Sequence, residues 1–174
     1  RFIEPNRTLL AQENQAAVLA QITEQLRAFV GGAFEQLCRD WAVAAGRESG
    51  LPFTPEYVGS DWQAKTRQAD VVAVNWRGRQ VLVGEAKWIG SDVSRSVISD
   101  LQARADKVIS RLQRARPAKG QEWAVSLYLF ARQGLTPAAQ AEAERQQVRV
   151  LTFADIVRDL EHSIDPISRP TKRY

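Results

Sequence analysis

The 174-residue sequence has one cysteine, one histidine and no apolar run of membrane-spanning length, and each scarcity excludes a class of site. The single thiol, Cys38, excludes an internal disulfide and a cysteine-rich zinc site, and it fits a reducing cytoplasm. The single imidazole, His162, leaves little for histidine-based zinc chemistry or a Ser-His-Asp triad. Any hydrolytic site therefore has to rest on carboxylates, lysine and a hard metal ion.

The chain also lacks a signal-peptide pattern and the roughly 20 consecutive apolar residues of a bilayer span, so we expect no membrane segment. It begins at Arg1 and contains no methionine, which indicates a fragment of a longer protein. Its composition is typical of a folded domain, with 44% hydrophobic and 25% charged residues. The net charge of +4 is a mild bias towards polyanionic partners or a solubility device.

The spacing of apolar residues predicts an α/β fold, with three α/β/α layers around a central mixed sheet. Three- and four-residue apolar steps mark the helices, and valine-rich runs mark the strands. We expect helices over residues 12–30, 33–45, 92–115, 137–146 and 154–161. We expect strands over residues 57–62, 69–76, 80–88, 122–130 and 148–153. Helices that alternate with strands favour a sheet covered on both faces.

Three regions are expected along the chain. Residues 1–30 form an N-terminal helical linker, in which the apolar stripe of the helix docks on the core, on a preceding domain or on a second copy of the chain. Residues 31–162 form the folded domain, and Gly31-Gly32 is expected to interrupt the helical pattern at its start. Residues 163–174 carry prolines and basic residues and are expected to form a flexible tail.

Acidic and basic residues meet on the two strands of one expected hairpin. A two-residue turn at residues 77–78 gives a register in which Asp70 lies opposite Glu85, with Cβ atoms about 4.5–5.5 Å apart. Because side chains alternate along a strand, Glu85 and Lys87 point to the same face. The register therefore predicts that Asp70, Glu85 and Lys87 form one cluster.

Such a cluster has a chemistry of its own. Two close carboxylates repel each other unless a cation lies between them, and oxygen ligands of this kind suit Mg²⁺ or Mn²⁺. Lys87 can orient or deprotonate an attacking water or stabilise a pentavalent phosphate. The alternative is a solvated hairpin with a weak ion pair. The buried character of residues 81–83 and the room left by Gly84 favour a site for phosphodiester cleavage.

Asp70 followed by Glu85-Ala86-Lys87 on the next strand resembles the PD-(D/E)XK, or restriction-endonuclease-like, nuclease superfamily. The resemblance implies that Asp70, Glu85 and the backbone carbonyl of Ala86 bind the metal, and that Lys87 is catalytic. It also implies that Glu35, on the preceding helix, joins the site. Ala69 stands where the superfamily name has proline, a position that many members also change.

Glu35 has an alternative role, because it lies beside the apolar stripe and one turn from Arg39, with which it can pair. Both roles remain open at this point.

A narrower resemblance covers nearly the whole chain. Residues 1–7, 30–35, 69–73 and 84–88, and more loosely 129–135, are similar to the C-terminal domain of unknown function of archaeal-type AAA-like ATPases. This resemblance implies that an ATPase domain precedes the fragment in the same chain.

Basic residues recur on the expected helix 92–115 at three- and four-residue steps: Arg104, Lys107, Arg111 and Arg114. Such a stripe can follow the phosphates of a nucleic acid, although a solvated helix face is an equally ordinary explanation. Trp62, Trp76 and Trp88 lie near the hairpin and can stack on unpaired bases, but Trp76 and Trp88 are expected to cover the core.

Together these patterns predict a cytoplasmic Mg²⁺- or Mn²⁺-dependent nuclease, with DNA as the expected nucleic acid and an attached ATPase as partner. One alternative is a catalytically silent module that binds nucleic acid or assembles its ATPase, and a homo-oligomer is open too. Another is an enzyme that cleaves nucleotides or polyphosphate with the same metal chemistry. Because a fold does not determine a function, only measured activity separates these alternatives.

Overall fold

The computed structural model describes residues 7, 15–48, 50–63, 66–115 and 122–164. The chain forms two compact units, Arg1–Phe34 and Glu35–Tyr174. The helices are α2 (Gln15–Arg47), α3 (Arg95–Ala115), α4 (Pro137–Arg145) and α5 (Phe153–Ile164). The strands are β1 (Tyr57–Gln63), β2 (Thr66–Asn75), β3 (Gln80–Lys87), β4 (Ala124–Ala131) and β5 (Arg149–Thr152). None of the helices in these described ranges combines the length and apolarity that a membrane span requires.

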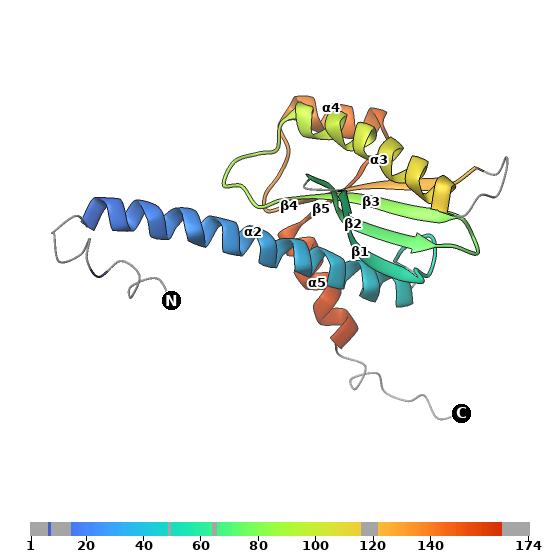
Figure 1. Ribbon diagram of the computed structural model, residues 1–174, viewed down its shortest axis with the longest axis horizontal. Coiled ribbons are helices and arrows are strands. Elements are labelled where there is room, and N and C mark those ends of the chain that lie inside the picture. The colour runs from blue at the N-terminus through green and yellow to red at the C-terminus, as the bar shows by residue number, and fades with distance from the viewer. Residues whose placement is uncertain (1–6, 8–14, 49, 64–65, 116–121, 165–174) are drawn as a thin grey trace. The chain divides into compact units, whose positions relative to one another are not determined.

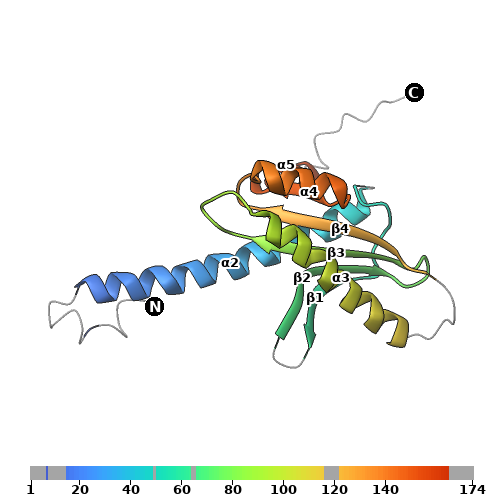
Figure 2. The same ribbon diagram turned by 90° about the horizontal axis from the view of Figure 1, so that it is seen from above.

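The five strands form one mixed sheet in the order β1-β2-β3-β4-β5. The first three strands are antiparallel, and β3, β4 and β5 are parallel. Helices α3 and α4 cover one face of the sheet, and α5 and residues 35–47 of α2 cover the other (Figures 1 and 2). The prediction of a three-layer α/β/α fold around a central mixed sheet is confirmed.

Each face of the sheet has its own apolar core. Towards α3 and α4, alternate residues of the strands pack on the apolar stripe that the sequence predicted for α3. The buried members are Val72, Val74, Val81, Val83, Leu127, Leu129, Ile98, Leu101, Ala105 and Val108. On the other face the Trp41 ring of α2 packs against Tyr128 and Phe130, with centroid distances of 5.7 and 5.5 Å. The Trp41 indole N–H donates to Asp159 of α5 at 3.0 Å, which ties the two helices of this layer together.

The predicted break at Gly31-Gly32 is wrong, because α2 runs without interruption from Gln15 to Arg47. A glycine inside a helix costs only about 1 kcal/mol relative to alanine and removes no hydrogen bond. No proline lies within α2, and a proline would be needed to block its backbone bonds. Two glycines therefore weaken this helix locally without ending it.

The β2–β3 hairpin has the register that the sequence predicted, but a longer turn. Asn75 pairs with Gln80 and Val71 with Gly84, so paired positions keep the expected sum. The connection is the four-residue segment 76–79 rather than a two-residue turn. Its last residue, Arg79, adopts a φ of 51°. The register is unchanged because the longer turn takes one residue from the end of β2 and one from the beginning of β3, relative to the predicted two-residue turn.

The remaining boundaries differ from the prediction by a few residues at the ends of the elements. Helix α5 continues to Ile164, so the first two residues of the predicted tail are helical. The rest of that tail, residues 165–174, lies outside the described residues.

Glu142 holds α4 against the beginning of α3. Its side chain is only 4% exposed, and it accepts hydrogen bonds from Arg145, Gln146 and Arg95, the last at 3.1 Å. The hydrogen bonds from Arg145 and then Gln146 lower the pKa of Glu142 from 4.5 to about 2. This buried carboxylate therefore helps to set where α3 lies over the sheet.

Replacing Gly84 with alanine should destabilise the domain. An added Cβ would lie 2.7 Å from the Phe130 ring and 3.2 Å from the Val71 Cβ, in the core between β3 and its neighbours. Overpacking of this kind costs about 1–3 kcal/mol, measured as the free energy of unfolding in urea. Gly32→Ala is the matched control, because its Cβ would meet no atom within 4 Å, and it should stabilise α2 by about 0.5–1 kcal/mol. Equal effects of the two changes would contradict this packing argument.

Glu142→Gln should lower the free energy of unfolding at pH 7 and lose that effect in acid. The folded-state pKa of about 2 lies below the usual 4.5, so the stabilisation is fully present above pH 4.5 and disappears as the pH falls towards 2. Urea unfolding at pH 7 measures the full effect, and unfolding at pH 3, between the two pKa values, should show it clearly reduced. Glu144→Gln, an exposed change on the same helix, should have little effect at either pH. A Glu142→Gln deficit of equal size at both pH values would exclude the ionised carboxylate as its cause.

Candidate active site

The candidate site lies where strands β2 and β3 separate. Their backbone pairing reaches Val71–Gly84, and the next residue of β2 is Asp70. The Asp70 carboxylate accepts a hydrogen bond from the backbone N–H of Ala86 at 2.9 Å, and its side chain is buried. The Asp70 carboxylate therefore takes the place of the backbone carbonyl that would accept the Ala86 N–H if β2 and β3 stayed paired.

The carbonyl of Ala86 faces the same side as its N–H. In an antiparallel pair, the N–H and the C=O of one residue both point towards the same neighbouring strand. The N–H and C=O of the next residue point towards the strand on the opposite side. The Lys87 carbonyl accepts from Arg132 N–H at 2.9 Å, on the β4 side. The Ala86 carbonyl accordingly points towards β2 and Asp70. Two of the three predicted metal-binding groups thus lie at one gap in the sheet.

Glu85 is a buried carboxylate held between two cations. Its side chain is 3% exposed, its Oε1 accepts from the Lys87 Nζ at 2.5 Å, and its Oε2 accepts from the Arg104 guanidinium of α3. The structure therefore brings Glu85 and Lys87 to one face of β3, as alternation predicted, and that face is the one covered by α3. The pairing of Glu85 with Arg104 was not predicted from the sequence.

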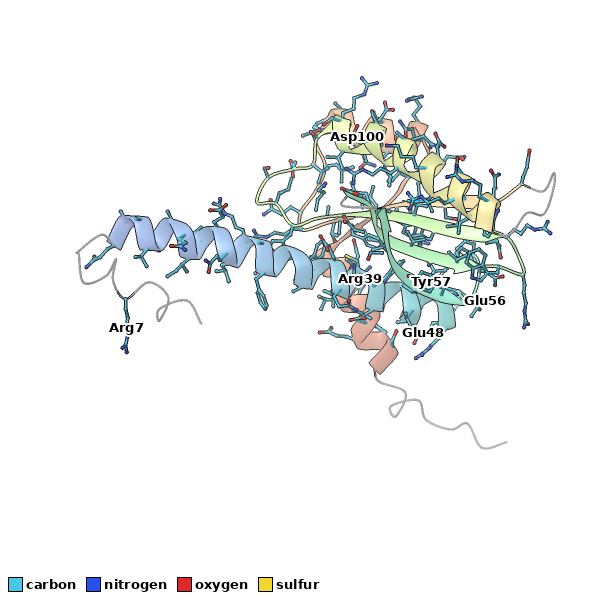
Figure 3. The ribbon with its side chains drawn as sticks, in the orientation of Figure 1. Arg7, Arg39, Glu48, Glu56, Tyr57 and Asp100 are labelled. Carbon is cyan, nitrogen blue, oxygen red and sulfur yellow. The ribbon has the colours of Figure 1, made fainter. Side chains whose placement is uncertain are left out.

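Residues of α2 approach Asp70 from the other layer. Arg39, labelled in Figure 3, donates to the backbone carbonyl of Asp70 at 3.0 Å and also binds Gln36. Cys38 is fully buried beside this contact. Its pKa is raised, first by burial, then by the charge of Asp70 and, to a smaller extent, by that of Glu35. Glu35 and Asp70 thus act on the same thiol, while the two predicted roles of Glu35 stay predictions.

The donors at this gap suit a hard divalent ion that is only partly enclosed by protein. Mg²⁺ is commonly bound by one or two carboxylates together with waters and substrate phosphates. Asp70, Glu85 and the Ala86 carbonyl match that donor set. Within the described residues, no three Asp, Glu, His or Cys side chains gather as a cage that would bind an ion alone. The residues therefore fit Mg²⁺ or Mn²⁺ completed by water and substrate.

The predicted basic stripe of α3 divides into two parts. Arg104 turns to Glu85, with a side chain that is 33% exposed. Lys107, Arg111 and Arg114 line a shallow hollow of about 220 Å³ further along the helix. The stripe therefore begins at the contact with Glu85 and continues away from it along one helix, while its binding of nucleic acid stays a prediction.

The tryptophans near the hairpin have mostly structural surroundings. Trp76 packs edge-on against Trp123, with ring centroids 5.7 Å apart. Trp88 packs edge-on against Phe153 at 5.2 Å, and the Arg132 guanidinium lies 5.0 Å from its ring centroid. The covering role predicted for Trp76 and Trp88 is consistent with these contacts, and the side chain of Trp62 lies outside the described residues.

A larger cavity of about 420 Å³ lies away from this cluster, between the end of α2 and α5. Trp41, Arg149 and His162 are among the residues that line it, and no member of the Asp70–Glu85–Lys87 cluster does. His162 uses its Nδ1 in a contact with the Arg158 carbonyl at 2.6 Å, which requires a proton on that nitrogen.

Comparison with known proteins matches the chain to a family. A family model described as archaea bacterial proteins of unknown function matches residues 1–98, which is more than half of the chain. The matched stretch contains Asp70, Glu85 and Lys87 and ends before Arg104. No curated protein and no solved structure matches the chain significantly.

Cys38 should not react with thiol reagents in the folded protein. It is fully buried, and burial together with the nearby Asp70 charge raises its pKa, so little thiolate is present or accessible. Because Cys38 is the single cysteine of the chain, the colour released from an aromatic disulfide reagent at pH 8 reports it directly. Labelling should follow the unfolding curve in urea. A Cys38→Ala, Ser110→Cys variant, with an exposed thiol on α3, should react at once, and similarly rapid labelling of the native chain would contradict its burial.

Proposed function

We propose that this chain, which belongs to the DUF234 family of archaea bacterial proteins of unknown function, is a divalent-metal-dependent nuclease that hydrolyses phosphodiester bonds in DNA. The observation that carries the proposal is the gap between β2 and β3. There the Asp70 carboxylate meets the backbone of Ala86, and Glu85 and Lys87 flank Ala86 on the α3 face. Carboxylates and a carbonyl are ligands that Mg²⁺ and Mn²⁺ prefer, and a lysine beside them can stabilise the charge that develops when a phosphodiester is hydrolysed.

The proposal includes membership of the PD-(D/E)XK superfamily. Support comes from the order of the residues, with an acid on one strand and Glu-Ala-Lys on its antiparallel neighbour. The three-layer arrangement around a mixed sheet also agrees with that resemblance. Coupling to an attached ATPase belongs to the proposal through the narrower resemblance to the C-terminal domains of archaeal-type ATPases. A cytoplasmic location belongs to it because a single cysteine fits a reducing compartment.

Asp70, Glu85 and the Ala86 carbonyl would hold Mg²⁺ or Mn²⁺, which when bound acts as a Lewis acid on the scissile phosphate and lowers the pKa of water. The ammonium group of Lys87 is held by Glu85 at the mouth of the gap, with its side chain 30% exposed. There it can orient the attacking water and stabilise the charge that develops on the phosphoryl oxygens.

In the reaction, a bond forms between the water oxygen and phosphorus while one ester P–O bond breaks. The attacking water loses a proton, and the leaving oxygen gains one. The basic residues along α3 would hold the flanking phosphates in register with the cluster.

The ion pairs of Glu85 with Lys87 and Arg104 also favour a second function, that of a binding module without catalytic activity. Both oxygens of Glu85 are engaged by cations of the chain itself. A domain with this arrangement can also be a catalytically silent module that binds nucleic acid through α3.

Cleavage of end-labelled single- and double-stranded DNA in Mg²⁺, Mn²⁺ or EDTA tests the two functions. We expect metal-dependent cleavage by the wild type, and a rate at least about 100-fold lower in Glu85→Gln and Lys87→Met. The loss should be similar for both variants, because each removes one part of the same cluster. Gel analysis of the products also separates cleavage at ends from cleavage within the strand.

Glu144→Gln removes an exposed acid from α4 and should cleave like the wild type. Circular dichroism should show that the cluster variants remain folded. Absence of cleavage with every metal, together with DNA binding that is equal in wild type and cluster variants, would reject the nuclease and support the binding module.

A further inference from the structure

We propose that Arg104 is an internal counter-ion that occupies the Glu85 carboxylate in the metal-free protein and moves to a substrate phosphate when the metal binds. This inference rests on the proposed nuclease function, and it adds that metal binding and nucleic-acid binding are coupled through one side chain. The observation behind it is the placement of Arg104 on Glu85, one of the predicted metal ligands.

The Glu85 carboxylate needs a cation because it is buried. Its side chain is 3% exposed, and a carboxylate taken out of water is costly unless charges and hydrogen bonds compensate it. Lys87 supplies one cation to Oε1, and Arg104 supplies another to Oε2. The Glu85 carboxylate is therefore already neutralised by the chain itself.

A divalent ion cannot join this arrangement without a rearrangement. Bound to Glu85, it would place two further positive charges beside a lysine and an arginine that already share the carboxylate. As an ion that prefers oxygen ligands, it would compete with the Arg104 guanidinium for the Glu85 carboxylate. One of the two cations of the chain has to withdraw.

Arg104 is better able to withdraw than Lys87. Lys87 lies two residues from Glu85 on the same strand and the same face, so its ammonium group stays near the carboxylate. Arg104 reaches Glu85 from a different element, α3, and its long side chain is 33% exposed and borders solvent. Rotation about its side-chain bonds can carry the guanidinium into water at little cost in packing.

The released guanidinium would join the other basic residues of α3. Lys107 lies one turn along the helix and Arg111 two turns, and together with Arg114 they line the shallow hollow of the stripe. A planar guanidinium binds phosphate through two parallel hydrogen bonds, which suits it to the phosphate nearest the cluster. Arg104 would thus be the phosphate-binding residue between the metal site and the stripe.

Two linked effects follow. The competition from Arg104 weakens metal binding in the absence of nucleic acid. Metal binding frees Arg104 and so strengthens nucleic-acid binding, and by thermodynamic reciprocity nucleic acid strengthens metal binding by the same factor. The inference therefore predicts that metal binds weakly alone and tightly with substrate.

Calorimetric titration of the full chain with Mn²⁺ tests the competition without requiring activity. Arg104→Gln should bind Mn²⁺ about tenfold more tightly than the wild type, as expected for loss of one charge-assisted hydrogen bond that opposes binding. Arg77→Gln is the control, since it removes the same charge from a side chain that is 95% exposed in the turn between β2 and β3, outside the site and the basic stripe. Its Mn²⁺ affinity should change by less than about threefold, because exposed charges are screened. Glu85→Gln should abolish this binding.

The DNA arm of the experiment uses fluorescence anisotropy of a short labelled duplex in EDTA or in Ca²⁺, an oxygen-binding ion. The metal should raise the wild-type affinity for DNA, and the gain should be clearly smaller in Arg104→Gln than in Arg77→Gln. In the wild type, the Nε–H resonance of Arg104 should also shift when Mg²⁺ is added. This last readout needs no variant and holds even if Arg104→Gln folds poorly.

The outcomes separate the two proposals. Mn²⁺ binding that Glu85→Gln abolishes, but that Arg104→Gln leaves unchanged or weakens, would overturn the role of Arg104 while leaving the nuclease proposal intact. A wild-type chain that binds no Mn²⁺, with or without DNA, would overturn both. An unshifted Arg104 resonance in saturating Mg²⁺ would overturn the withdrawal of its guanidinium from Glu85.

Discussion

The site depends on one buried carboxylate, that of Glu85. It lies on a central strand, 3% exposed, and a charge in that position is tolerated only if cations reach it. One cation comes from the same strand and the other from α3, so the carboxylate fixes the helix against the sheet as well as organising the site. The position of α3 is also set at its first residue, where Arg95 binds the buried Glu142 of α4. Two buried acids, each neutralised by arginine, thus determine where the basic helix lies.

Part of the cluster could be predicted from the sequence because it depends on local rules. The alternation of side chains brings Glu85 and Lys87 to one face of β3, and the predicted hairpin register holds as far as Val71–Gly84 despite an error in the turn. The predicted pair Asp70–Glu85 lies one step beyond the last paired residues, where Asp70 instead accepts a hydrogen bond from the Ala86 N–H. The turn is in fact four residues long, yet the register is unchanged because the extra residues come equally from β2 and β3. The core face of α3 follows from periodicity in the same way.

The errors arise where a local rule competes with the rest of the structure. Gly31-Gly32 were expected to end a helix, but the propensity cost of two glycines is small compared with the hydrogen bonds of a helix that continues on both sides. The partners of Arg39 and Arg104 could not be predicted, because each binds a residue of a different element, and that requires knowledge of how helices pack on the sheet. The alternation of side chains along β3 could have shown that Glu85 faces the helix that covers this side of the sheet. It could not have shown which basic residue of that helix pairs with Glu85.

The ion pairs around Glu85 explain how a buried acid is tolerated in the sheet without any partner from outside the chain. Buried acids without partners would destabilise the sheet at the gap between β2 and β3. Lys87 and Arg104 neutralise the Glu85 carboxylate, and the Ala86 N–H donates a hydrogen bond to the Asp70 carboxylate. The same contacts oppose the ion that the site is proposed to bind, because their removal is part of the cost of binding. Stability without metal and affinity for metal are therefore opposed at this site, and a second ligand that accepts the displaced arginine, such as a phosphate, relieves the conflict.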